Sequence, residues 1–250
     1  LIVEGGVFFS LFLVAVALVG MGEFNKIQYA QSDPKPSRII TSGGYAAVPL
    51  MIAAAQVEIQ AGPLCLLAGV ILAGGIAALW RVEQARDTVH HLGGQILGLV
   101  YVAGPLVMLV LIRNAPQGAA WIFYLLMVIF AGDTGAYYVG SYWGKHKLCP
   151  RVSPKKTVEG ALGGVFANLL AAALAQILFL EPLTLSAAMG LGILAGAAGQ
   201  VGDLFESIFK RAASIKDSGT ILPGHGGILD RIDALLFAIP VVYAGRYLLA

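Results

Sequence analysis

Charged side chains are scarce in this 250-residue sequence, and so are cysteines. Only 12% of the residues are charged and 58% are hydrophobic, whereas a soluble domain has about 25% charged and roughly 45–50% apolar residues. The formal net charge of +2 is too small a cationic excess for a nucleic-acid-binding surface. Cys65 and Cys149 are too few for a disulfide framework or a zinc cluster. These shortages exclude a soluble globular protein, a disordered chain and a nucleic-acid binder.

Apolar segments recur along the whole chain, each long enough to cross a hydrocarbon core of roughly 30 Å as a helix. They predict an all-α fold, a polytopic transmembrane helical bundle of eight spans. The predicted spans are residues 3–22, 45–60, 63–80, 93–112, 119–140, 159–180, 185–206 and 232–249. Glycine pairs such as Gly140–Gly144 and Gly192–Gly196 are typical of close helix packing in lipid.

Lysine and arginine are divided unevenly between the connections. Fourteen of the 16 lie in or beside the connections after the first, third, fifth and seventh spans, which the positive-inside rule assigns to the cytosol. Leu1 and the C-terminus then lie outside, so we expect a further helix before Leu1. The sequence therefore predicts an integral membrane protein with two regions, residues 1–118 and residues 119–250. The cytosolic loops of the second region are 141–158 and 207–231.

Ionisable side chains inside spans are costly, so each one calls for a function or a structural partner. Asp133, Asp203 and Glu206 are such residues, and each lies toward the cytosolic end of its span. Asp203, Glu206, Ser207 and Lys210 fall at i, i+3, i+4 and i+7, on one helical face. The alternative is a set of internal carboxylate–lysine pairs that only stabilises the helix end.

The two polar segments after these spans are dense in functional groups. Residues 223–227 are rich in glycine and could direct backbone N–H groups at an anion, and Asp230 and Asp233 follow at i, i+3. These two carboxylates could equally be first-turn residues that the helix dipole favours. The second segment, 153–160, carries adjacent lysines that could be an ordinary positive-inside feature.

Carboxylates beside lysine and arginine at a membrane surface suit phosphoryl or nucleotidyl transfer, because such reactions need metal and cations to neutralise phosphate charge. Oxygen ligands favour Mg²⁺ or Mn²⁺ over zinc. No Gly-x-x-x-x-Gly-Lys-[Ser/Thr] loop is present, which argues against a Walker-type ATPase.

Residues 207–233 resemble the signature of the phosphatidate cytidylyltransferase family. They contain Ser-x-apolar-Lys-Arg, Lys-Asp, His-Gly-Gly and Asp-Arg-x-Asp in the order and spacing of that signature. Segments 133–137, 153–160 and 202–207 resemble the same family. The resemblance implies the reaction of CTP with phosphatidate to give CDP-diacylglycerol and pyrophosphate, at the cytosolic face of a bacterial inner membrane. It implies a homodimer that contacts membrane lipid and no nucleic acid, with packing helices and dimer contacts at 1–118 and a catalytic region at 119–250.

The resemblance also implies roles for individual residues. It implies that Asp203 and Asp230 hold Mg²⁺, or Mn²⁺, with room for a second monovalent or divalent cation. It implies catalytic roles for Lys156, Lys210, Arg211, Lys216, Asp217, His225, Arg231 and Asp233. It implies substrate binding by Asp133, Ser153, Lys155, Glu206, Ser207, Gly226 and Gly227. The alternatives are a CTP-dependent enzyme for another lipid phosphate or a polyprenol, and an ion-coupled transporter.

Overall fold

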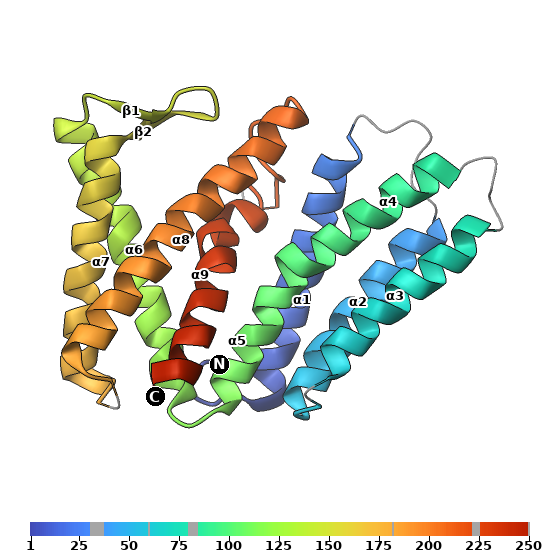
Figure 1. The fold of residues 1–250 in the computed structure, drawn as a ribbon, viewed down its shortest axis with the longest axis horizontal. Coiled ribbons are helices and arrows are strands. Elements are labelled where there is room, and N and C mark those ends of the chain that lie inside the picture. The colour runs from blue at the N-terminus through green and yellow to red at the C-terminus, as the bar shows by residue number, and fades with distance from the viewer. Residues whose placement is uncertain (31–37, 60, 80–84, 182, 222–225, 250) are drawn as a thin grey trace. The chain divides into compact units, whose positions relative to one another are not determined.

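The computed structural model describes residues 1–30, 38–59, 61–79, 85–181, 183–221 and 226–249. Within these ranges, eight helical spans are long and apolar enough to cross a membrane (Figure 1). The predicted all-α class and number of spans are therefore confirmed. The chain divides into two compact units, one of Leu1–Asn114 with Ala212–Asp230 and one of Ala115–Arg211 with Arg231–Ala250.

The first unit holds four spans. Three are the single helices α1 (Gly6–Gln28), α2 (Arg38–Gln56) and α3 (Gly62–Leu79). The fourth joins α4 (Ala85–Gly98), the π-helical η2 (Leu99–Ala103) and α5 (Gly104–Asn114). α2 begins at Arg38 instead of the predicted residue 45, because its polar first turns lower the hydropathy without ending the helix.

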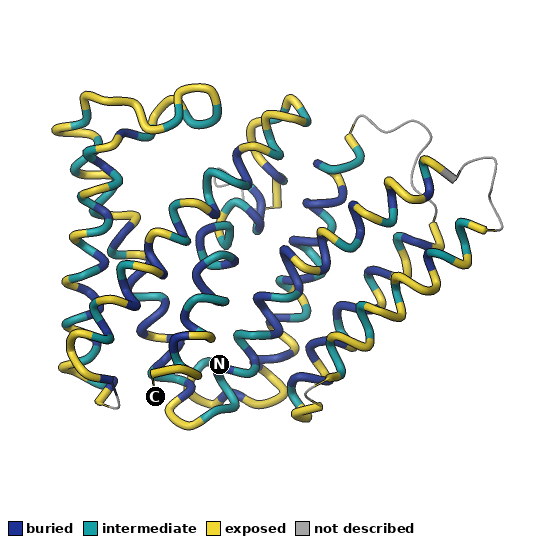
Figure 2. Tube along the Cα trace, in the orientation of Figure 1, coloured by how far each residue is buried: buried dark blue, intermediate teal, exposed yellow. Residues whose placement is uncertain are grey.

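A π turn adjusts the fourth span beside a proline. Pro105 has no backbone N–H to continue the α-helical ladder, and Gly104 N donates to Leu99 O across the π turn. One turn earlier, Gly98 lets α1 approach closely, since an added Cβ would lie 2.8 Å from the sulfur of Met21. α3 is mostly exposed along its length (Figure 2), as expected of a helix that faces lipid.

The second unit is built from four spans and a hairpin. Its spans are α6 (Gly118–Trp143), α7 (Val158–Phe179), α8 (Leu185–Ala212) and α9 (Leu229–Leu249), although the first two residues of α9 belong to the first unit. The predicted packing role of Gly192 is confirmed, because a Cβ there would lie 2.5 Å from Ala172 Cβ on α7. Gly196 likewise meets Asn168 of α7.

A two-stranded hairpin lies in the segment that we predicted as a loop. β1 (Lys147–Cys149) and β2 (Ser153–Thr157) pair antiparallel. Thr157 caps α7 by accepting a hydrogen bond of 3.1 Å from Gly160 N. Glu159, in the first turn of α7, accepts hydrogen bonds from His146 N at 3.1 Å and His146 Nδ1 at 2.6 Å. These contacts attach both strands to the start of α7 and so fix where β2 presents its side chains.

Candidate active site

Carboxylates and lysines from four elements of the second unit lie near one another. β2 supplies Lys156, whose Nζ lies 2.7 Å from Asp203 Oδ2 on α8. The two side chains are 26% and 40% exposed, so both remain accessible to water and to a ligand. The residues that gather here are Asp133 on α6, Lys156 on β2, Asp203, Glu206 and Lys210 on α8, and Asp233 on α9.

Asp203 is the centre of this cluster. Charge interactions link it with Asp133 on α6 and with Asp233 on α9. α8 and α9 come close at this point, because a Cβ on Gly202 would lie 2.5 Å from Asp233 O. Like charges brought together in this way repel one another, and a cation bound among them would relieve that repulsion.

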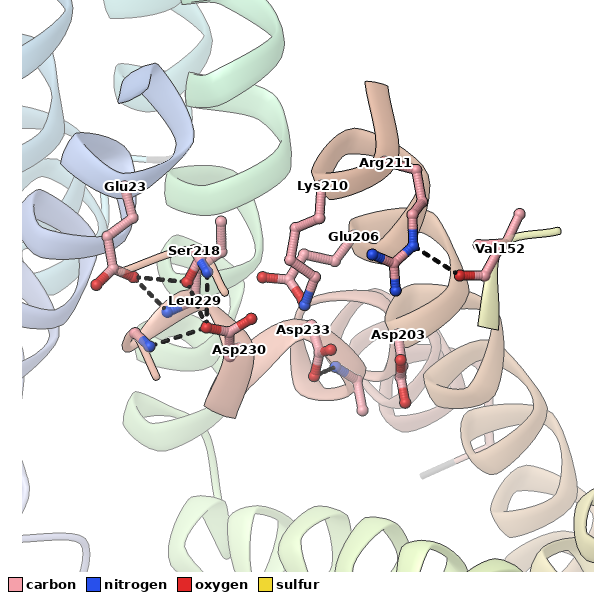
Figure 3. A network of polar contacts seen from close by, with 12 residues as sticks. Glu23, Val152, Asp203, Glu206, Lys210, Arg211, Ser218, Leu229, Asp230 and Asp233 are labelled. Carbon is pink, nitrogen blue, oxygen red and sulfur yellow. Dashed lines mark hydrogen bonds and ion pairs between the residues drawn. The ribbon is translucent and has the colours of Figure 1, made fainter. Parts of the chain in front are cut away.

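The predicted helical face of α8 divides into two ion pairs. Glu206 is fully buried, and Lys210 Nζ lies 2.6 Å from its Oε2 at i, i+4 (Figure 3). This pair matches the structural alternative, in which α8 stabilises its own end. Asp203 instead pairs with Lys156, 47 residues away in sequence. Ser207 is buried beside Glu206.

The basic residues around the hairpin have different surroundings. Arg211 Nε donates to Val152 O at 3.2 Å, which joins the end of α8 to the turn before β2 (Figure 3). Ser153 is half-buried at the start of β2, and Lys155 is exposed. Lys156 is the neighbour that reaches the carboxylate of Asp203. Arg231, in the first turn of α9, is exposed.

Asp230 lies in the first unit, where the segment after α8 surrounds its carboxylate. Asp230 Oδ2 accepts hydrogen bonds from Ser218 N at 2.9 Å, Ser218 Oγ at 2.8 Å and Gly227 N at 2.8 Å. Gly226 has φ of +80°, which L side chains rarely adopt, and a Cβ there would lie 2.7 Å from Asp230 Oδ2. Gly226 and Gly227 thus shape the surroundings of this carboxylate.

The remaining predicted residues of this segment are Lys216, Asp217 and His225. A Cβ on Gly226 would lie 3.7 Å from Asp217 Cβ and 2.7 Å from Asp230 Oδ2, so both residues flank this glycine. Lys216 and Asp217 are exposed between α8 and α9. His225 lies outside the described residues. Asp203 belongs to the second unit and Asp230 to the first, so their joint binding of one metal ion stays a prediction.

Glu23 is a buried carboxylate that was not among the residues predicted from the sequence. This α1 residue is 1% exposed and accepts hydrogen bonds from Ser218 Oγ, Ile228 N and Leu229 N (Figure 3). The available signal was a carboxylate directly after the predicted span 3–22, where an ionisable side chain still calls for a partner. Its partners, about 200 residues later in the chain, could not be inferred from hydropathy.

The sequence of this chain is similar to those of known proteins. A model described as the cytidylyltransferase family matches residues 1–249. The chain is 43% identical over 157 residues to a phosphatidate cytidylyltransferase of Bacillus subtilis (strain 168), covering 62% of this chain and 58% of the relative. It is 45% identical over 127 residues to the protein of that name from Staphylococcus aureus (strain COL), covering 50% and 48%. The chain thus spans about half to three fifths of the length of these curated relatives.

Proposed function

Because the chain belongs to the cytidylyltransferase family, we propose that it transfers the cytidylyl group of CTP to phosphatidate. The observation that carries this proposal is the cluster around Asp203, in which carboxylates and lysines from α6, β2, α8 and α9 lie together. Cations and metal-binding carboxylates are what a reaction between two phosphate groups requires. The names of the relatives support phosphatidate as the acceptor.

In the proposed reaction, an oxygen of the phosphatidate phosphate attacks the α-phosphorus of CTP. A new P–O bond forms, the bond between the α-phosphorus and the bridging oxygen breaks, and pyrophosphate leaves with that oxygen. The lipid phosphate is already ionised, so the enzyme needs no covalent intermediate. Lys156 and Lys210 carry the positive charge that would hold the phosphates and offset the charge on the leaving group. Arg211 and Arg231 would add further positive charge near the phosphates.

The residues present suit a magnesium ion. Mg²⁺ is usually bound through one or two carboxylates, with water and substrate phosphates as the other ligands. Asp203 is 40% exposed on its side chain and has carboxylates on two other helices nearby. In the part of the chain that the structure describes, no group of three His, Cys, Asp or Glu side chains is placed so that it could hold a metal ion. Bound Mg²⁺ would neutralise phosphate charge, and Asp203 would supply a carboxylate ligand. A role for Asp230 as a second ligand rests on the family signature that residues 207–233 resemble.

We propose that the site faces the cytosol of a bacterial inner membrane. Within the second unit, the cluster uses the C-terminal parts of α6 and α8, the strand before α7 and the first turns of α9. Alternating spans place these four ends on one side of the membrane, and the basic connections lie on that side. CTP would then reach the site from the cytosol. Phosphatidate would enter from the bilayer, because each buried CH₂ of its chains contributes about 0.8 kcal/mol.

A radiochemical assay tests this proposal directly. Purified protein in lipid nanodiscs is given labelled CTP, Mg²⁺ and a panel of lipid phosphates that contains phosphatidate, an ether-linked analogue and a polyprenyl phosphate. We expect pyrophosphate release and labelled CDP-diacylglycerol with phosphatidate. Turnover with only another lipid phosphate would assign that lipid as the acceptor in place of phosphatidate. No turnover with any of these acceptors would refute the proposed cytidylyl transfer. Cross-linking in nanodiscs would test the expected homodimer.

A further inference from the structure

Glu23 lies near the C-terminal end of α1, a helix long and apolar enough to cross a membrane, and only 1% of its surface is exposed. Burying an ionisable group is costly unless hydrogen-bond partners compensate its charge. Glu23 must therefore be compensated by specific neighbours, and the identity of those neighbours indicates what it does.

The neighbours of Glu23 belong to the start of α9. Glu23 Oε2 accepts a hydrogen bond of 2.8 Å from Leu229 N, and Oε1 accepts one of 3.2 Å from Ile228 N. Leu229 is the first residue of α9, so its N–H has no carbonyl partner within the helix. An anion at this position also interacts favourably with the helix dipole. Glu23 therefore caps α9 from a different helix.

Two glycines allow the segment before α9 to approach this carboxylate. A Cβ on Gly219 would collide with Glu23 Oε1, and a Cβ on Gly227 would lie 2.5 Å from Oε2. The backbone thus passes on either side of the Glu23 side chain at distances that only glycine allows. This close fit is a second observation, independent of the hydrogen bonds, that the segment folds around Glu23.

The contacts of Glu23 lead on to Asp230 through Ser218. Ser218 Oγ lies 3.3 Å from Glu23 Oε2 and 2.8 Å from Asp230 Oδ2. A hydroxyl donates one hydrogen bond at a time, so the two carboxylates share a single donor. Gly227, whose N–H also binds Asp230, lies against Glu23 as well. The groups that orient Asp230 are therefore held in place by Glu23.

We propose that Glu23 is a positioning residue for the transfer reaction, which acts through Ser218 and Gly227 to orient the carboxylate of Asp230. The proposal rests on the proposed function for its catalytic part. Glu23 itself need not touch either substrate. Its charge caps α9 and fixes the segment that carries the signature motif, and the orientation of Asp230 follows from that.

Glu23→Gln tests the proposal, with Glu4→Gln as the matched control. Gln keeps the size of the side chain but presents an NH₂ group where Glu23 accepts hydrogen bonds from two backbone N–H groups. Hydrogen–deuterium exchange without substrates measures the capping, and kcat and KM for CTP measure the positioning. We expect Glu23→Gln to speed exchange at Ile228 and Leu229 and to lower kcat, each roughly tenfold or more, as for a lost charge-assisted hydrogen bond. KM for CTP should change much less, and Glu4, which is exposed, should tolerate the change.

Ser218→Ala is a second test, which distinguishes the capping of α9 from the positioning of Asp230. It can also be used if Glu23→Gln does not fold. It removes the hydroxyl between the carboxylates and leaves Glu23 bound to Leu229 N. We expect a lower kcat, with exchange at Leu229 as slow as in the wild type. Unchanged exchange in Glu23→Gln, or unchanged kcat in Ser218→Ala, would overturn the proposal. A wild-type protein without cytidylyl transfer would reject the proposed function, and the exchange measurement would still test the capping by Glu23.

Discussion

Lys156 Nζ and Asp203 Oδ2 lie 2.7 Å apart and join strand β2 to α8. Both side chains are partly exposed, and ion pairs of this kind contribute at most about 1 kcal/mol. A substrate phosphate could therefore compete for Lys156, and a bound cation could replace the lysine at Asp203. The pair keeps two oppositely charged groups in place without holding either of them tightly.

Asp203→Asn should lower kcat/KM at least about tenfold, which corresponds to about 1.4 kcal/mol of transition-state stabilisation. A neutral amide cannot hold a cation beside the substrate phosphates as the carboxylate does. Product formation in nanodiscs measures the effect, with Glu181→Gln as control because Glu181 is an exposed carboxylate of the same unit. More than a tenth of the wild-type rate would mean that Asp203 is not an essential metal ligand.

The two lysines of the cluster should differ when each is replaced by alanine. Lys210 is 14% exposed and pairs with the fully buried Glu206, and breaking a buried pair costs about 3–5 kcal/mol. Lys156 is more exposed, so its loss should cost stability far less. In detergent, Lys210→Ala should therefore have a much lower Tm of unfolding than Lys156→Ala. One of these variants should raise KM mainly for CTP and the other mainly for phosphatidate. Equal Tm values together with equal changes in the two KM values would contradict separate roles for the two lysines.

Asp230→Asn should abolish turnover while the protein stays folded. The amide oxygen of Asn can still accept the hydrogen bonds from Ser218 and Gly227 that Asp230 Oδ2 accepts, but the charge is lost. Turnover and thermal unfolding are measured together, and Asp87→Asn at the start of α4 supplies the same substitution elsewhere in the unit. A variant that unfolds as the wild type does and still turns over would exclude Asp230 as a metal ligand.

Cys149 should react with a membrane-impermeant thiol reagent from the cytosolic side only. It lies in β1, between basic residues whose distribution predicts that the hairpin faces the cytosol. A Cys65→Ser background leaves Cys149 as the single thiol, and inside-out and right-side-out vesicles compare the two faces. Labelling from outside would invert the topology and place the cluster where CTP is absent.

The spans could be predicted from sequence because lipid imposes a simple rule. A backbone in hydrocarbon must satisfy its own hydrogen bonds, so each long apolar segment becomes a helix. The hairpin was missed because β2 reads Ser-Pro-Lys-Lys-Thr, which has neither apolar alternation nor high β propensity. Its strands are held by contacts such as Glu159 with His146, which a hydropathy profile does not reveal.

The candidate site could be predicted as a set of residues but not as a set of partners. The i, i+4 spacing indicated Glu206 with Lys210, since a helix fixes that distance. The pairing of Lys156 with Asp203 depends on how β2 meets α8, and one sequence carries no signal for it. Glu23 was overlooked for the same reason, because a lone carboxylate near the end of a span gives no indication of what it binds.

The capping of α9 by Glu23 has a consequence for biosynthesis. Glu23 is made early, but Ser218 and Leu229, which bind it, follow 195 and 206 residues later. During insertion the carboxylate must remain hydrated or shielded by the insertion machinery until nearly the whole chain has been translated. Chains that stop before residue 218 would retain an unsatisfied acid in the membrane.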